Sequence, residues 1–208
     1  MSVIDQLAFS IGRRDEVPNV ELAQKIAATQ DKQAVKELAQ LLTHKKKDIR
    51  HDSIKVLYEV GAIEPALIKD YLQNFLAQLK DKNNRMVWGA MIAIDAVSAV
   101  APEDVYEHLT EILDAGEKGS VITKDGVAGV LVKLSRNEKL VEETMPLLFE
   151  HLMKAAPNQF PMYAEKAMPV VTEQYKKQFI SILNNRMSDL EKDSQKKRVE
   201  KLLKKLNK

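Results

Sequence analysis

The feature that most constrains the fold is a helical spacing of apolar residues that continues from one end of the chain to the other. Apolar side chains recur at steps of three and four residues, and no stretch alternates as a strand does. Glycine and proline number only seven each in 208 residues, so few positions interrupt helical propensity. We therefore predict an all-α fold of about twelve helices. The predicted helical segments are 2–12, 19–28, 31–43, 47–60, 64–81, 84–100, 102–115, 120–135, 138–155, 160–173, 175–190 and 193–207.

The predicted helices repeat in pairs, with a period of roughly 35 to 38 residues. Each second helix follows a polar turn and runs into apolar residues. A period in this range is typical of stacked helix pairs, each of which buries its apolar face against its neighbours. We predict a single domain over residues 1–208, built from about six antiparallel helix pairs. The second helices are predicted to begin near Asp48, Asn84, Val121, Phe160 and Ser194.

One repeat carries a recognisable motif. Within residues 47–61, an acidic turn leads into Ile49-Arg50, then Ser53, Leu57 and Gly61. This order resembles the signature of the HEAT-repeat and armadillo-like superfamily, in which a polar turn precedes Val/Ile-Arg, a small residue, an aliphatic stripe and a closing glycine. The resemblance is close in this unit and extends over most of the remaining chain by period alone. It implies a right-handed α-α superhelix, a HEAT-like solenoid.

Prolines and glycines mark the expected helix boundaries. Gly61 is predicted to end a helix in the left-handed conformation that glycine adopts freely. Pro146 and Pro169 fall inside predicted helices and are expected to kink or split them, because proline lacks the backbone donor. First-turn prolines, which lose no needed hydrogen bond, are Pro18, Pro65, Pro102 and Pro161.

The last predicted helix, 193–208, is strongly basic. Residues 192–208 hold eight Lys or Arg against two acids, whereas the whole chain has a net charge of only +2. An apolar stripe runs through this basic helix, which is typical of a terminal cap with one face docked and one face in water. We predict a basic C-terminal capping helix. Its stripe consists of Val199, Leu202, Leu203 and Leu206.

Several classes of chemistry find no support in the sequence. Cysteine is absent, which excludes disulfides, thiolate metal sites and cysteine nucleophiles. No two histidines stand four residues apart on one helical face, and Gly126 and Gly129 lie in a helical pattern without a phosphate-loop lysine. We therefore expect no metal, no cofactor and no catalytic residue. The sequence favours a protein that is not an enzyme.

The N-terminus and the most apolar stretch indicate where in the cell the protein is expected. The N-terminus lacks a basic start followed by an apolar stretch, so we expect no secretory signal and a cytoplasmic protein. Residues 86–101 form the most apolar run, yet it contains Asp95 and is shorter than the roughly 20 residues that cross a bilayer. We predict a buried helix there and no membrane span.

Trp88 and Asp95 raise one alternative. Steps of three and four residues place them on one helical stripe, either as a core tryptophan with a solvated carboxylate or as a pocket. Some bacterial DNA glycosylases that remove alkylated bases are built from HEAT-like repeats and use aromatics with an Asp in a concave groove. The chain resembles them in size and fold. Its single tryptophan and the seven-residue Trp–Asp spacing depart from their motif, so no catalytic residue is carried over.

We therefore expect a non-enzymatic repeat scaffold that binds a protein or peptide on the concave surface formed by the second helices. The alternative is a nucleic-acid-binding protein or a DNA glycosylase of the HEAT-like kind, which would need a groove lined with Lys and Arg. The residues predicted to line the surface mix both charges and so favour the first function. They are Lys55, Glu59, Trp88, Asp95, Arg136, Tyr163 and Lys166.

Overall fold

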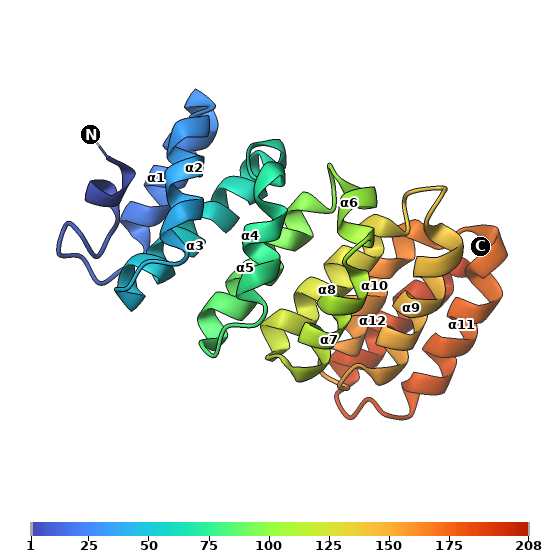
Figure 1. Cartoon of the computed structure of the whole chain (residues 1–208). Coiled ribbons are helices and arrows are strands. Elements are labelled where there is room, and N and C mark those ends of the chain that lie inside the picture. Colours follow the sequence, from blue (N-terminus) through green and yellow to red (C-terminus); the bar gives the residue numbers. More distant parts are fainter. Residues whose placement is uncertain (1, 208) are drawn as a thin grey trace. The chain divides into compact units, whose positions relative to one another are not determined.

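The computed structural model describes residues 2–207 (Figure 1). These residues form α-helices and short 3-10 helices and contain no strand, so the predicted all-α fold is confirmed. The α-helices are α1 (Val17–Thr29), α2 (Lys32–Leu41), α3 (Lys47–Ile63), α4 (Leu72–Gln78), α5 (Asn84–Val97), α6 (Pro102–Tyr106), α7 (Leu109–Lys118), α8 (Val121–Leu134), α9 (Val141–Lys154), α10 (Phe160–Ala167), α11 (Glu173–Met187) and α12 (Asp193–Leu206). The 3-10 helices are η1 (Val3–Gln6), η2 (Pro65–Leu67), η3 (Lys69–Tyr71) and η4 (Met168–Val170).

The second helices of the repeats are α3, α5, α8, α10 and α12. Their first residues lie within one position of the predicted starts and follow one another at intervals of 37, 37, 39 and 33 residues. The contacts divide the chain into two compact units, unit 1 (Met1–Val130) and unit 2 (Leu131–Lys208). Each unit is described by itself below, and the prediction of a single domain stays a prediction.

In unit 1 the helices α1, α3 and α5 lie side by side, with α2 packed on α3 and α4 packed on α5. Small residues allow this close approach. A Cβ atom added to Gly89 of α5 would lie 2.8 Å from Cγ1 of Ile54 on α3, and one added to Gly126 of α8 would lie 2.5 Å from Cγ of Met91 on α5. Glycine at both positions therefore lets side chains of the neighbouring second helix pack directly against the backbone.

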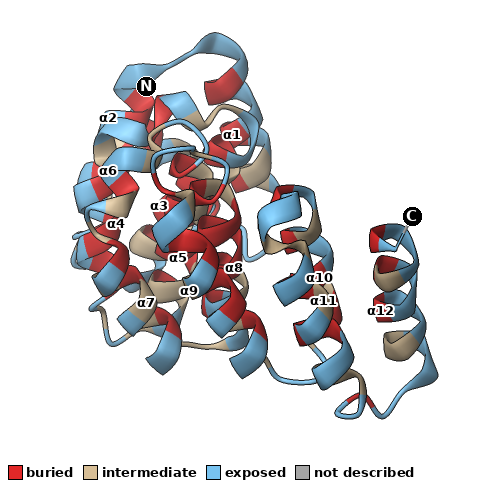
Figure 2. Cartoon of the chain, turned by 90° about the vertical axis from the view of Figure 1, so that its right-hand side faces the viewer, coloured by how far each residue is buried: buried red, intermediate tan, exposed pale blue. Residues whose placement is uncertain are grey.

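In unit 2 the helices α10 and α11 both contact α9 and α12. The rings of Phe149 on α9 and Phe179 on α11 stack at 5.9 Å. Val199, Leu202 and Leu206 of α12 are buried and Leu203 is half-buried. The predicted stripe is thus covered, and the capping role stays a prediction. Exposed residues occupy the opposite side of this helix (Figure 2).

The prediction of a helix over residues 2–12 is wrong. Only η1 forms there, and the chain continues in turns that bury Leu7 and Ala8. Side chains from elsewhere satisfy the backbone donors, because the Ala8 N–H donates to Asn19 Oδ1 at 3.0 Å and the Phe9 N–H donates to Asp52 Oδ2 at 2.7 Å. Tertiary hydrogen bonds thus take the place of helical ones at Ala8 and Phe9, while the Ile11 N–H still donates to the Leu7 carbonyl at 3.2 Å.

Three predicted helices are shorter or broken. Segment 64–81 consists of η2, η3 and α4, segment 102–115 is split into α6 and α7, and segment 160–173 ends at Ala167 before η4, where Pro169 interrupts the α-helix. Gly61 does not end a helix but lies inside α3. An added Cβ there would lie 2.5 Å from Cδ1 of Ile68, so the missing side chain makes room for the turn between η2 and η3.

Among residues 2–207, no helix is both long enough and apolar enough to cross a membrane.

Candidate partner-binding surface

Three of the predicted surface residues meet on one face of unit 1. Lys55 and Glu59 stand one turn apart on α3, and Trp88 lies on the neighbouring α5. The Lys55 ammonium donates to Glu59 Oε1 at 2.6 Å and forms an ion pair with Glu16 Oε2 at 3.0 Å. Burial alone would lower the pKa of Lys55, but hydrogen bonds to Glu59, Tyr58 and Glu16 raise it above its ordinary value. Lys55 is therefore held charged.

Glu16, the residue before α1, connects two second helices. Its Oε2 pairs with Lys55 on α3, and its Oε1 accepts a 2.6 Å hydrogen bond from Nη2 of Arg85 on α5. Burial would raise the pKa of Glu16, but the hydrogen bond and charge of Lys55, followed by those of Arg85, hold it below its ordinary value. One carboxylate thus joins cations from two successive repeats.

An aromatic pair lies beside these charges. The rings of Tyr58 and Trp88 are 5.9 Å apart and tilted by 52°. The Lys55 ammonium lies 4.9 Å from the Tyr58 ring centre, and the Arg85 guanidinium lies 6.0 Å from that of Trp88. Tyr58 is buried and Trp88 is half-buried. We call the surface formed by Glu16, Lys55, Tyr58, Glu59, Arg85 and Trp88 the α3–α5 face.

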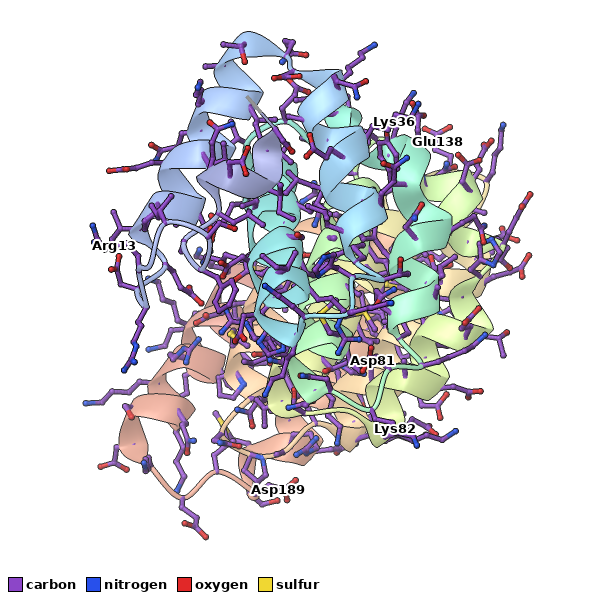
Figure 3. The ribbon with its side chains drawn as sticks, turned by 60° about the vertical axis from the view of Figure 1, so that its left-hand side comes forward. Arg13, Lys36, Asp81, Lys82, Glu138 and Asp189 are labelled. Atoms are coloured by element: carbon purple, nitrogen blue, oxygen red, sulfur yellow. The ribbon has the colours of Figure 1, made fainter. Side chains whose placement is uncertain are left out.

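Further polar contacts tie α3 to the turn before α5. Nη1 of Arg50 donates to Asp81 Oδ2 at 3.1 Å, and Nδ2 of Asn83 lies 2.8 Å from Nε2 of His51. Asp81 is labelled in Figure 3. Burial, and then the charge of Arg85, lower the pKa of His51 below its ordinary value of 6.5. These contacts hold the second helices of adjacent repeats in fixed register at this end of the face.

Asp95 lies two turns beyond Trp88 on α5, where the packing against α8 is tight. A Cβ atom added to Gly129 would overlap the Asp95 carboxylate. This carboxylate is therefore packed against the neighbouring helix. Two acids, Glu16 and Glu59, also belong to the α3–α5 face, whereas a nucleic-acid groove would be lined by Lys and Arg. The arrangement does not favour the nucleic-acid or glycosylase alternative.

The other predicted surface residues belong to unit 2. Tyr163 does not line a surface, because its side chain is only 2% exposed and its ring stacks on that of His151 at 5.1 Å. Lys166 is exposed on α10, beside Glu165, and Arg136 is exposed in the turn after α8. Tyr163 lies on the side of α10 that packs against neighbouring helices. Helical spacing alone had predicted that it lies on the exposed binding surface.

Glu16 and Arg85 were not predicted as members of the surface. Arg85 lies in the first turn of the second helix α5, one position before the place that corresponds to Arg50 in the preceding repeat, so the repeat pattern held a weak signal for it. Glu16 has no such signal, because its partners lie 39 and 69 residues further along the chain. Only the fold brings them together.

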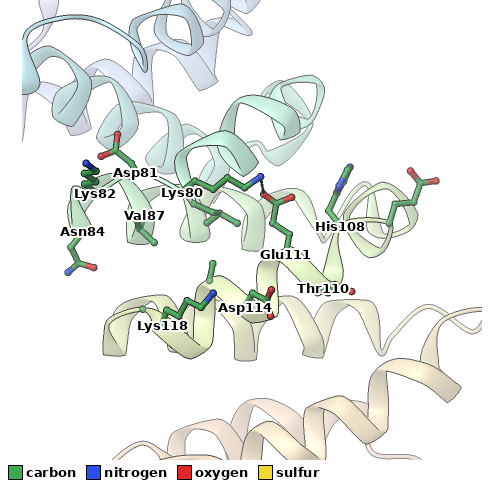
Figure 4. A pocket seen from close by; sticks show the side chains of 14 residues that line it. Lys80, Asp81, Lys82, Asn84, Val87, His108, Thr110, Glu111, Asp114 and Lys118 are labelled. Carbon is green, nitrogen blue, oxygen red and sulfur yellow. Dashed lines mark ion pairs between the residues drawn. The ribbon is translucent and has the colours of Figure 1, made fainter.

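A hollow of about 760 Å³ lies elsewhere in unit 1, between the turn after α4 and helix α7 (Figure 4). Its floor includes Leu79, Val87 and Ala115, and Lys80 pairs with Glu111 across its rim at 2.8 Å. Cations and acids alternate around it, so its charge selects neither anions nor cations.

Over residues 2–207, no group of three or more His, Asp or Glu side chains is arranged to hold a metal ion. The expectations that the protein takes no metal, takes no cofactor and is not an enzyme stay predictions.

Sequence comparison and structural comparison give different results. No protein-family model matches the chain, and no curated protein matches it. Among solved structures, a computationally designed armadillo repeat protein for modular peptide recognition has a TM-score of 0.65 at 14% identity, over 97% of this chain and 97% of that chain. A designed armadillo repeat protein in complex with the peptide (KR)4 has a TM-score of 0.68 at 13% identity, over 90% of this chain and 86% of that chain.

A third structure, of an engineered protein, has a TM-score of 0.64 at 15% identity and covers 99% of both chains. Sequence identities this low show a similarity of fold alone. The similarity covers 90% or more of this chain in each case. The resemblance expected from residues 47–61 is thereby confirmed at the level of structure. The chain has an armadillo- or HEAT-like helical repeat fold.

Proposed function

We propose that this protein is a non-enzymatic repeat scaffold in the cytoplasm that binds a protein or peptide on the α3–α5 face. The observation that carries the proposal is the half-buried Trp88, which lies between Tyr58 and Arg85 on adjacent second helices. Tryptophan, tyrosine and arginine are the residues enriched at the energetic centres of protein interfaces. The α3–α5 face combines all three within one surface.

The charges of this face support a peptide ligand. Helices α3 and α5 present fixed donors and acceptors, because Lys55, Glu59, Glu16 and Arg85 hold one another in place. A surface whose side chains are already ordered loses less conformational entropy when a ligand binds. Designed armadillo repeat proteins with the same fold are made for peptide recognition, and one is seen with a peptide bound. These likenesses favour a peptide ligand here without naming it.

A displayed library of random peptides, selected on the full chain, tests the proposal. Selected peptides should bind the wild-type chain and lose about tenfold or more in affinity to Trp88→Ala, the loss expected for an interface centre. Because Trp88 is the single tryptophan, its fluorescence should also change on binding.

The matched control is Tyr71→Ala, which removes a half-buried aromatic side chain from η3. This variant should bind the selected peptides as the wild type does. Peptides that bind Trp88→Ala and wild type equally would place the binding surface elsewhere and contradict the proposal. So would a selection that yields no binder.

A further inference from the structure

Helix α12 carries far more charge of one sign than a docked cap requires. Its fourteen residues include six cations and two acids. Its apolar stripe is already buried, with Val199 at 0% and Leu202 at 5% exposure, so this stripe is not free to enter a lipid bilayer. What remains accessible on α12 is its basic side. The cations are Lys196, Lys197, Arg198, Lys201, Lys204 and Lys205.

Three of these cations form a column along the exposed side. Lys197, Lys201 and Lys205 follow one another at four-residue steps and are all exposed, so their attachment points lie about 6 Å apart along the helix axis. In the part of the chain that the structure describes, none of the three takes part in an ion pair. Like charges at this spacing destabilise a helix. Folding alone therefore does not account for the column.

Glu165, the acid beside the lysine column, already forms an ion pair with Arg198. Glu165 of α10 receives two hydrogen bonds from Arg198, Nε to Oε1 at 2.9 Å and Nη2 to Oε2 at 2.6 Å. The hydrogen bond from Arg198 is the main cause that lowers the pKa of Glu165, and the charges of Lys201 and Lys205 lower it further. This places both lysines close enough to act on the same carboxylate. Neither lysine forms an ion pair in the described part of the chain, and Lys166 is a further exposed cation on α10.

We propose that this α10–α12 face, formed by Glu165, Lys197, Arg198, Lys201 and Lys205, binds an extended acidic segment of a protein partner. Alternate side chains of an extended chain point to the same side about 6.6–6.8 Å apart, close to the 6 Å step of the lysine column. An acidic residue at every second position can therefore meet successive lysines. The Arg198–Glu165 pair borders the column and keeps Arg198 in a fixed position. This surface belongs to unit 2 and is separate from the α3–α5 face.

The probe is a fluorescein-labelled peptide of about ten residues in which glutamate alternates with serine, followed by fluorescence anisotropy with the full chain. The triple variant Lys197→Gln, Lys201→Gln, Lys205→Gln should lose about tenfold in affinity, because three exposed charge pairs are removed together. The control Lys32→Gln, Lys36→Gln, Lys69→Gln removes the same net charge from exposed positions of unit 1 and should lose less than about threefold. Circular dichroism should show both triple variants folded.

Several outcomes separate this proposal from its competitors. Trp88→Ala should bind the acidic peptide with the affinity of the wild type. The proposal for the α10–α12 face can therefore hold if the proposal for the α3–α5 face fails, and the α3–α5 proposal can hold if this one fails. Equal losses in the two triple variants would mean nonspecific attraction and overturn the proposal. It is equally overturned if wild type fails to bind the peptide. Tighter, lysine-column-dependent binding of a single-stranded oligonucleotide, or of vesicles with anionic lipid, would assign the surface to that ligand instead.

Discussion

Removing the guanidinium of Arg186 should destabilise unit 2 more than any exposed substitution on the same helix. Arg186 lies on α11 and its side chain is only 12% exposed. Its Nη1 donates to the carbonyl oxygens of Leu152 at 2.8 Å and Met153 at 2.7 Å, and its Nη2 donates to that of Ala155 at 2.7 Å. The guanidinium thus supplies donors to carbonyl groups at the C-terminal end of α9, where the last carbonyls lack the partner that a helix interior provides. The Leu152 carbonyl also accepts from the Ala155 N–H at 3.3 Å.

The magnitude follows from what Arg186→Met leaves behind. The carbonyls of Leu152 and Ala155 belong to residues largely shielded from water, so each loses a charge-assisted hydrogen bond worth about 1.5 kcal/mol. Met153 is exposed, and water can replace the donor there. The guanidinium also lies 4.8 Å from the Phe160 ring centre, a contact worth about 0.5–1 kcal/mol. The expected loss is about 3–4 kcal/mol in the free energy of unfolding.

Urea unfolding followed by far-ultraviolet circular dichroism measures this loss. Arg186→Lys should lose less than Arg186→Met, because an ammonium can still donate but cannot span the three carbonyls with a planar fork. The control Lys177→Met changes an exposed cation on the same helix and should stay within about 0.5 kcal/mol of wild type. A loss below about 1 kcal/mol for Arg186→Met would refute the assigned role of this guanidinium.

Three further predictions concern stability. Gly89→Val should lower the free energy of unfolding by about 1–3 kcal/mol, because even a Cβ would come 2.8 Å from the buried Ile54. Chemical denaturation should show no such loss for Thr110→Val, which changes an exposed residue. Deleting residues 193–208 should lower the melting temperature and solubility by uncovering the α10 and α11 side chains that α12 covers, and an unchanged melting temperature would contradict the capping role. The pKa of His51 is lowered below 6.5 in the folded chain, so the unfolded chain takes up this proton first and stability falls as pH drops through about 6.5 and below. In His51→Gln, the free energy of unfolding measured at a series of pH values should change less with pH in that window. An unchanged slope of this free energy against pH would contradict the role assigned to His51.

The repeat starts could be predicted because each depends on local signals. A polar turn followed by an apolar stripe marks Lys47 and Asn84 as clearly in the sequence as in the fold. Residues 2–12 have the same helical spacing, yet their donors are taken by Asn19 and Asp52. Nothing local distinguishes a segment that forms its own helix from one that is held by side chains of a neighbour.

The candidate surface could be predicted only in part, for a related reason. Helical spacing places Lys55 and Glu59 on one side of α3, and in the structure the two side chains form an ion pair. Spacing does not say which side of α10 meets other helices, so Tyr163 was assigned to a surface although it is buried. Glu16 was missed because an ion pair across 69 residues leaves no trace in a periodic pattern.

The bridge made by Glu16 has a consequence for how unit 1 unfolds. In a repeat protein each repeat contacts its nearest neighbours, so its stability approximates a one-dimensional chain of local terms, and the ends can fray one repeat at a time. Glu16 precedes α1 but pairs with Arg85 on α5, past the intervening α3. This ion pair adds an interaction energy between helices that are not nearest neighbours. Releasing the segment before α1 therefore also removes an ion-pair partner from α5. Helices α1, α3 and α5 should therefore open as one cooperative block.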